Sequence, residues 1–158
     1  MNELLKLLEK DSRLTPEMLA AMLSKEVGDI KKEIEKYEKD GTIVGYNTLI
    51  DWDKTDREYV TALIELKITP QRDIGFDRVA ERIYNYPEVQ SHYLMSGGFD
   101  LCVLIEGKTL KEVALFVAEK LAPMDSVVST ATHFVLRKYK DKGLIYKRGD
   151  VDLRGECL

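Results

Sequence analysis

The sequence contains few of the residues that build metal centres or covalent cross-links. Among 158 residues there are two cysteines, Cys102 and Cys157, and two histidines, His92 and His133. The cysteines have neither the spacing of a metal site nor that of a disulfide framework. Cys102 lies within an apolar stretch, where we expect it to be buried and unreactive. The sequence therefore does not support a metal-centred or disulfide-stabilised fold.

Long hydrophobic runs are missing as well. No stretch approaches the roughly 20 apolar residues that span a bilayer, and charged residues interrupt the N-terminal segment MNELLKLLEK where a signal peptide would be apolar. With 44% hydrophobic and 33% charged residues, the composition is that of a globular chain. We therefore expect a cytoplasmic protein without a membrane partner, divided into two small domains that gain stability from oligomerisation.

Hydrophobic spacing predicts three short helices before residue 41. Thr15 and Pro16 mark the start of the second helix, Ser24 is the expected cap of the third, and Gly41 follows its end. The apolar positions expected to face a core are Leu4, Leu5, Leu7 and Leu8, then Met18, Leu19, Met22 and Leu23, and finally Val27, Ile30, Ile34 and Tyr37. A tight turn between the last two helices is typical of a helix-turn-helix, and residues 42–47 predict a β-wing. Residues 1–48 are therefore interpreted as a winged helix-turn-helix domain.

The third helix of such a domain lies in the major groove of DNA. Residues 1–50 carry eight Lys and Arg against ten Asp and Glu, a net charge of −2, so DNA contact depends on where the lysines stand. The candidate DNA-binding residues are Lys25, Gly28, Asp29, Lys31, Lys32 and Lys36. The lysines can neutralise phosphates, Gly28 permits close backbone approach, and Asp29 can accept a hydrogen bond from a cytosine amine. The alternative interpretation is a solvated helix face of mixed charge.

After a polar linker at residues 49–58, the periodicity changes to that of alternating strands and helices. Strands are expected at 59–68, 89–95, 99–106 and 127–136, with one helix ending before Pro87 and another opening with a capping box at Thr109 and Glu112. The order βαββαβ predicts a ferredoxin-like sensor domain at 59–141, followed by a charged tail at 142–158. The fold class is therefore α+β, with a winged helix-turn-helix before a ferredoxin-like domain.

The third expected strand is apolar on both of its faces. Residues such as Val103 and Ile105 alternate with Cys102 and Leu104, so the sheet face away from the helices also needs cover. We expect the sheet of a second protomer to supply that cover, which makes the protein at least a dimer.

Three fragments carry a resemblance to a known family. They are EKDGTIVGY at residues 38–46, SGGFDL at 96–101, and VSTAT with FVL at 128–132 and 134–136. In this order they resemble the Lrp/AsnC transcriptional regulators, and the resemblance covers residues 1 to about 145. It implies binding of double-stranded DNA, dimers that assemble into tetramers or octamers, and control by amino acids or related metabolites. We expect an amino-acid effector and no other cofactor.

The resemblance also implies where the effector binds. The glycine-bearing turn before the third strand would form part of a cleft between sensor domains, which points to Gly97, Gly98, Phe99 and Asp100. Glycine N–H groups can hold a carboxylate and Asp100 can pair with an ammonium. Thr130 and Thr132 share one face of the last strand and are further candidates. The alternative interpretation is a simple hairpin turn in which Asp100 bonds local backbone.

The sequence departs from the family in its reading helix, which typically has arginines where Lys32, Glu33 and Lys36 stand. Lysine lacks the bidentate grip of arginine on guanine. Two alternatives therefore stay open, a haem-biosynthetic decarboxylase subunit with the same outline and an effector-binding partner that no longer reads DNA. Since His92 and His133 are expected on opposite sheet edges, and no nucleophilic triad or phosphate loop is present, we expect no enzyme activity.

Overall fold

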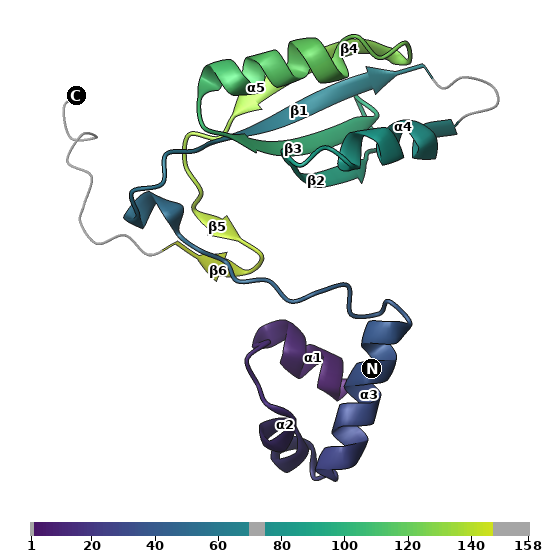
Figure 1. Cartoon of the computed structure of the whole chain (residues 1–158), viewed down its shortest axis with the longest axis vertical. Coiled ribbons are helices and arrows are strands. Elements are labelled where there is room, and N and C mark those ends of the chain that lie inside the picture. Colours follow the sequence, from purple (N-terminus) through teal and green to yellow (C-terminus); the bar gives the residue numbers. More distant parts are fainter. Residues whose placement is uncertain (1, 70–74, 147–158) are drawn as a thin grey trace. The chain divides into compact units, whose positions relative to one another are not determined.

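The computed structural model describes residues 2–69 and 75–146. The chain divides into two compact units, Met1–Ile50 and Asp51–Leu158, which are the helical and the sheet-containing parts of Figure 1. None of the helices in these ranges is long and apolar enough to cross a membrane. The predicted tail extends to residue 158, and its part at 147–158 lies outside the described residues.

The first unit consists of three helices around a small apolar core. They are α1 at Glu3–Lys10, α2 at Pro16–Leu23 and α3 at Val27–Lys39. The core residues are Leu4, Leu8, Leu19, Ala20 and Ile30. As expected, α2 begins with Pro16, and the hydroxyl of Thr15 accepts a hydrogen bond from the Met18 N–H at 3.3 Å.

Two expectations about α2 are wrong. Ser24 does not cap α3 but ends α2 in the left-handed conformation, with φ 53°, and Glu26 precedes α3 without a side-chain capping bond. Met18 and Met22 are 51% and 57% exposed instead of buried. Met18 and Met22 are four residues apart and therefore lie on the same side of this short helix. Leu19 and Ala20 face the core, so the two methionines face away from it.

The predicted β-wing is also wrong, since residues 42–47 form no strand. A strand needs a backbone partner, and here the Ile43 N–H donates to the Tyr37 carbonyl at 2.9 Å instead. The Tyr46 hydroxyl donates to Glu38 at 2.9 Å, while Val44 is 96% exposed. The segment therefore follows the end of α3 as an extended chain.

The second unit is a four-stranded antiparallel sheet with helices on one face. Its elements are η1 at Trp52–Lys54, β1 at Val60–Ile68, α4 at Gly75–Tyr84, β2 at Val89–Leu94, β3 at Leu101–Gly107, α5 at Leu110–Phe116, a π-helical turn η2 at Val117–Leu121, and β4 at Val127–Phe134. The strand order is β2-β3-β1-β4. This confirms the predicted βαββαβ arrangement, although β3 begins two residues later than expected and β4 ends two residues earlier.

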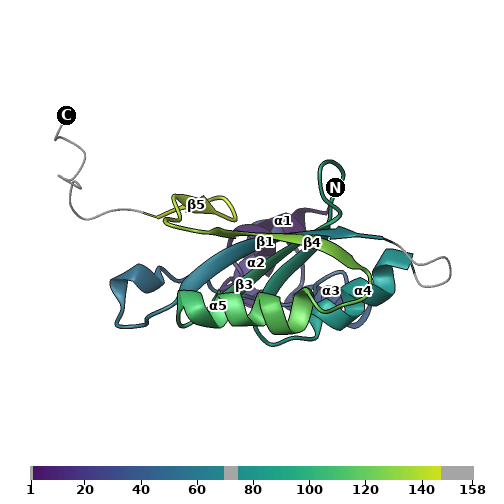
Figure 2. The same cartoon turned by 90° about the horizontal axis from the view of Figure 1, so that it is seen from above.

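The helix-covered face of the sheet forms the main core. Ala62, Ile64 and Leu66 of β1 are fully buried and lie opposite Ile105, Val103 and Leu101 of β3. The residues that α4, α5 and η2 add are Val79, Ile83, Val113, Phe116 and Leu121. Figure 2 shows α4 and α5 on the same side of the strands. The capping box is present, because Thr109 Oγ1 accepts from the Glu112 N–H at 3.1 Å, while Glu112 accepts from the Lys108 N–H at 2.6 Å.

Within residues 2–69 and 75–146, no helix lies over the other face of the sheet. It carries Leu63 and Glu65 of β1 together with Cys102 and Leu104 of β3. Cys102 is buried, as expected, and this burial raises the pKa of its thiol. Beyond β4, the strands β5 at Lys140–Asp141 and β6 at Leu144–Ile145 form a small hairpin, so the start of the expected tail pairs within its own chain.

The left-handed residue between α2 and α3 generates a stability prediction. A serine in this conformation is strained, whereas glycine is not, so Ser24→Gly should stabilise the helical unit by about 0.5–1 kcal/mol. Slower amide exchange at the buried Ile30 would report the gain. Ser12→Gly is the matched control, because Ser12 has no positive φ and the same change there should bring no gain.

Candidate DNA-binding and effector sites

All six residues predicted to contact DNA have exposed side chains or backbone on or just before α3. The four lysines among them differ in whether they form ion pairs within the chain. Lys25 pairs with Glu33 at 3.0 Å, and Lys31 lies 3.7 Å from Glu17. Lys32 and Lys36 make no ion pair among the described residues. These two lysines lie one helical turn apart and are exposed without an ion pair, although the charge of Lys36 acts at longer range on Asp40.

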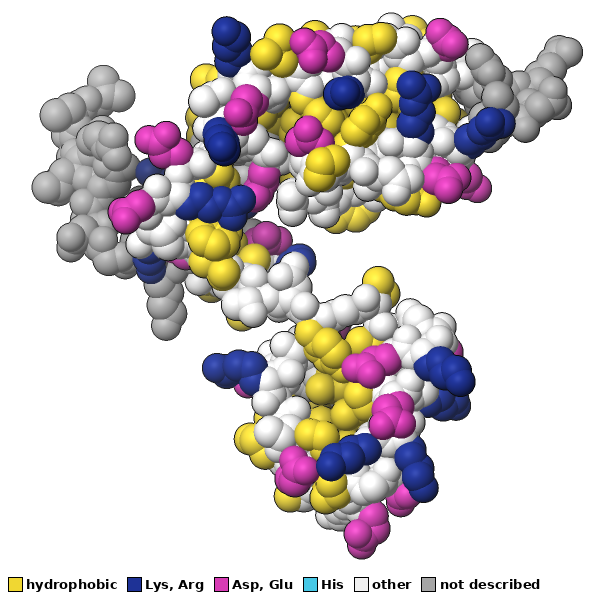
Figure 3. Space-filling model, viewed as in Figure 1, with side chains coloured by type: hydrophobic (Ala, Val, Ile, Leu, Met, Phe, Trp, Pro, Cys, Tyr) yellow, Lys and Arg dark blue, Asp and Glu magenta, His cyan; other side chains and the backbone are white. Residues whose placement is uncertain are grey.

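Gly28 and Asp29 lie in the first turn of α3. A side chain added at Gly28 would meet open space, so the absence of a side chain is not required by packing within the unit. Asp29 is exposed near the helix N-terminus, where a carboxylate is favoured by the helix dipole. Figure 3 shows Lys and Arg side chains interleaved with Asp and Glu over this unit, so no face of it in this view is uniformly basic.

Glu33 has a structural role that the sequence did not reveal. Its carboxylate accepts hydrogen bonds from Asn2 at 3.0 Å, from the Tyr37 hydroxyl at 3.2 Å and from Lys25 at 3.0 Å. The bond from Asn2, followed by that from Lys25, lowers the pKa of Glu33. Since Asn2 also caps α1, Glu33 joins that helix to α3. Glu33 stands where the family resemblance implied an arginine, and this acidic residue holds the two helices together.

The proposed effector residues of the glycine turn lie between β2 and β3. The Met95 N–H donates to the Asp100 carbonyl at 2.8 Å, which closes the turn. Gly97 has φ 136°, a conformation that other residues rarely adopt, and both glycines are exposed with open space around them. Their backbone N–H groups are therefore open to approach from outside, whereas Phe99 and Asp100 are half-buried.

Asp100 connects this turn to the end of β1. Its Oδ2 accepts a hydrogen bond from the Ile68 N–H at 2.7 Å, and its own N–H donates to the Leu66 carbonyl at 2.9 Å. Asp100 does bond backbone, but the alternative interpretation expected local backbone. The partner is a strand far along the chain and not the hairpin itself.

Thr130 and Thr132 lie on the same face of β4, as predicted. Thr130 is opposite Leu66 and Thr132 opposite Ile64, so both face the helix-covered side and are half-buried. Leu66 is also opposite Leu101, the residue after Asp100. The structure thus brings the glycine turn and Thr130 to the same end of the sheet, with Thr132 two positions further along β4.

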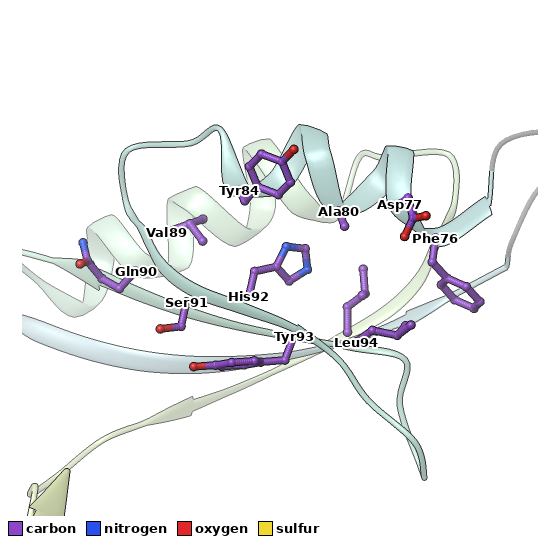
Figure 4. Close-up of a pocket in the computed structure, with 11 residues that line it drawn as sticks. Phe76, Asp77, Ala80, Tyr84, Val89, Gln90, Ser91, His92, Tyr93 and Leu94 are labelled. Carbon is purple, nitrogen blue, oxygen red and sulfur yellow. The ribbon is translucent and has the colours of Figure 1, made fainter. Parts of the chain in front are cut away.

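A cavity between α4 and β2 was not predicted. It measures about 240 Å³ and has Phe76, Ala80 and Tyr84 of α4 on one side. In Figure 4 the ring of His92 points from β2 toward α4, whereas Tyr93 points to the other side of the sheet. The His92 Nε2 is buried and has no hydrogen-bond partner among the described residues. Burial lowers the pKa of His92, and a backbone hydrogen bond with Ala80 opposes that shift only in part.

The two histidines do not form a joint site within one chain. β2 and β4 are the opposite edges of the sheet, as expected. The register also places the histidines on opposite faces, since His133 is paired with Leu63 and its Nε2 lies 3.2 Å from Glu65 on the face without helices. In the part of the chain that the structure describes, no group of three or more His, Cys, Asp or Glu could hold a metal ion.

The sheet-containing unit also matches a known family model. Residues 61–145 correspond to the model described as the Lrp/AsnC ligand binding domain. The chain belongs to the Lrp/AsnC family of transcriptional regulators. The predicted resemblance is therefore confirmed, and the matched residues span β1 to β6.

Relatives of known sequence support the same family over nearly the whole chain. The HTH-type transcriptional regulator YugG of Bacillus subtilis is 50% identical over 153 residues, which cover 96% of this chain and 92% of that protein. An HTH-type transcriptional regulator of Pyrococcus furiosus is 30% identical over 139 residues, 88% of this chain and 90% of its own length. Both matches are longer than the second unit, so each extends into the helical unit.

Solved structures share the fold at lower identity. The transcriptional regulator NMB0573 of Neisseria meningitidis, in complex with L-Met, has a TM-score of 0.71 at 20% identity and covers 89% of this chain and 93% of its own. The leucine response regulatory protein LrpA of Mycobacterium tuberculosis has a TM-score of 0.75 at 18% identity, with 90% and 97% covered. At these identities the comparison establishes the fold alone.

The buried His92 nitrogen generates a prediction about pH. Because the folded state lowers the pKa of His92, the unfolded state takes up more protons below the ordinary value of about 6.5. The stability contributed by neutral His92 is therefore present above that pH and is lost as the pH falls below it. Denaturant unfolding followed by the fluorescence of Trp52, the one tryptophan, should show this loss between pH 7.5 and 5.5.

Two histidine variants separate this effect from others. His92→Gln should flatten the loss between those pH values, whereas His133→Gln, which changes the exposed histidine on the other face, should keep it. Equal pH dependence in the unaltered protein and in His92→Gln would contradict the assignment.

Proposed function

We propose that this Lrp/AsnC regulator binds double-stranded DNA through α3 and responds to an amino acid bound at the glycine turn of its second unit. The observation that carries the proposal is the pair of exposed lysines without an ion pair, Lys32 and Lys36, on the third of three helices in a chain whose relatives are HTH-type regulators. Such a protein acts on DNA in the cytoplasm and controls amino-acid or related metabolism.

In the DNA complex, Lys32 and Lys36 neutralise phosphates. Lys25 and Lys31 contribute less, because Glu33 and Glu17 already offset part of their charge. Gly28 and Asp29 at the start of α3 approach the base edges, where Asp29 accepts from a cytosine amine. Since lysine contacts are point charges, we expect affinity to depend strongly on salt and on several dimers binding together.

The effector proposal rests on the glycine turn and on the family. Gly97 and Gly98 offer N–H groups to a carboxylate; Phe99, Asp100 and Thr130 lie at the same end of the sheet, and Thr132 lies two positions further along β4. The neisserial regulator with this fold was solved with L-Met, which supports an amino acid as the class of ligand. The site would be completed by a neighbouring sensor unit.

Dimers form through the sheet face without helices. Leu63 and Leu104 lie side by side on that face, next to the buried Cys102. Packing this face on its counterpart in a second copy would remove apolar area from water and bury the face as a sheet sandwich. Further assembly into tetramers or octamers would then bring glycine turns of different dimers together.

DNA binding is tested by fluorescence anisotropy with a fragment of the upstream region of the gene, over a salt series, with and without each common amino acid. The unaltered protein should bind with a steep salt dependence that an amino acid alters. Lys32→Ala with Lys36→Ala should lower affinity on all sequences and reduce the salt slope by about one unit per lysine. The control, Lys6→Ala with Lys10→Ala on α1, removes equal charge and should change the slope less. Absence of binding at low salt would exclude the DNA-binding proposal.

The dimer is tested by light scattering after size-exclusion chromatography. Leu104→Lys places a charge on the face proposed to pack against a second copy, so the variant should be monomeric at micromolar concentration. Leu110→Lys makes the same change at a residue of α5 that is 57% exposed, and it should leave the dimer intact. A dimer that survives Leu104→Lys would place the interface elsewhere.

A further inference from the structure

Asp100 stands where three segments of the second unit meet. It ends the turn that contains Gly97 and Gly98, and its carboxylate lies 2.7 Å from the Ile68 N–H at the end of β1. The register of β1 with β4 shifts between Lys67 and Ile68, and the Thr69 N–H donates to the Ser126 carbonyl at 2.9 Å just before β4. The Asp100 side chain thus bonds to β1 one residue before the chain bonds to the segment that leads into β4.

The Asp100 carboxylate accepts the hydrogen bond that a carbonyl of a neighbouring strand would otherwise accept from the Ile68 N–H. The last residue pair of β1 with β3 is Leu66 with Leu101, so the Ile68 N–H lies beyond the paired part of the strands. A backbone N–H in this half-buried position requires an acceptor, and a charged acceptor makes a stronger bond than a carbonyl. Asp100 supplies it while its own N–H donates to the Leu66 carbonyl at 2.9 Å.

These two bonds, together with the one from the Met95 N–H to the Asp100 carbonyl, anchor the last residue of the turn. No atom of another segment lies within 4 Å of a Cβ atom added at Gly97 or Gly98, so packing does not hold the glycines in place. Gly97 adopts a φ of 136°. Their orientation therefore depends on how the ends of the turn are held.

We propose that Asp100 is a positioning residue, which holds the Gly97–Gly98 turn on the end of β1 so that its N–H groups face the effector, and that it does not serve as the partner of the effector ammonium. The inference rests on the proposed effector site. It changes the expected chemistry of that site, because the group needed at position 100 is a hydrogen-bond acceptor for Ile68 and not a negative charge.

Asparagine at position 100 can replace aspartate as a positioning residue but not as the charged partner of an ammonium. Asp100→Asn keeps an oxygen that can accept from the Ile68 N–H but removes the charge that an ammonium would need. Asp100→Ala removes both. Asp125→Asn is a matched control, because it removes one negative charge from an exposed residue of the same unit.

The experiment combines amide hydrogen exchange at Ile68, measured by NMR, with calorimetric titration of each standard L-amino acid. We expect Asp100→Asn to keep Ile68 protected and to bind the tightest amino acid within about threefold of the unaltered protein. Asp100→Ala should exchange at Ile68 at least about tenfold faster and bind at least about tenfold more weakly, as expected for loss of a hydrogen bond to a charged group. Asp125→Asn should change neither quantity.

Other outcomes overturn the inference. If Asp100→Asn loses binding as fully as Asp100→Ala while Ile68 stays protected, the carboxylate is the ammonium partner. If Ile68 stays protected in Asp100→Ala, the anchoring bond is unimportant. Should the unaltered protein bind no amino acid, the proposed effector function fails, and exchange at Ile68 alone then decides whether Asp100 holds the turn. If Asp100→Ala does not fold, the comparison of Asp100→Asn with Asp125→Asn still distinguishes the two roles.

Discussion

The alternation of side chains along β1 is the constraint on which the second unit depends. Ala62, Ile64 and Leu66 are fully buried together with their neighbours on β3. A shift of one residue would turn all of them to the opposite face, so burial sets the register of β1 with both of its neighbours. The helices then cover one face, the other face is the one proposed to pack against a second copy, and the turn at residues 95–100 lies at the end of β1.

Besides the apolar cores, hydrogen bonds of two acidic side chains connect segments of the chain. In the first unit, Glu33 collects hydrogen bonds from Asn2, Tyr37 and Lys25, so one acidic residue both stabilises the helices and reduces the charge that Lys25 can offer to DNA. In the second unit, Asp100 accepts from Ile68 across the sheet. Both residues are acidic side chains that a charge count would treat only as opposing DNA or attracting an ammonium. Both accept hydrogen bonds from groups far away in the chain, and a charge count does not indicate these contacts.

The two units have separate tasks in the proposed function. DNA binding depends there on a few lysines against a net negative background, and such binding is sensitive to salt and to the number of copies bound together. The proposed effector site depends on backbone N–H groups held in place by a hydrogen bond between distant segments. The sheet face proposed to pack in a dimer lies on β1 and β3, of which β3 follows the glycine turn and β1 pairs with Thr130.

Elements with a local signal could be predicted from the order of the residues. The apolar periods of the strands, the Thr15 cap and the capping box at Thr109 depend on residues a few positions apart, so the helices, the βαββαβ order and the family fragments could be predicted. Other features depend on contacts between distant parts of the folded chain. Residues 42–47 are not a hairpin because no strand pairs with them, and Met18 and Met22 are exposed because the core lies on the other side of α2. The burial of His92 and the bond from Ile68 to Asp100, 32 residues away, likewise depend on contacts between segments that are distant in the chain, and a pattern of neighbouring residues does not encode them.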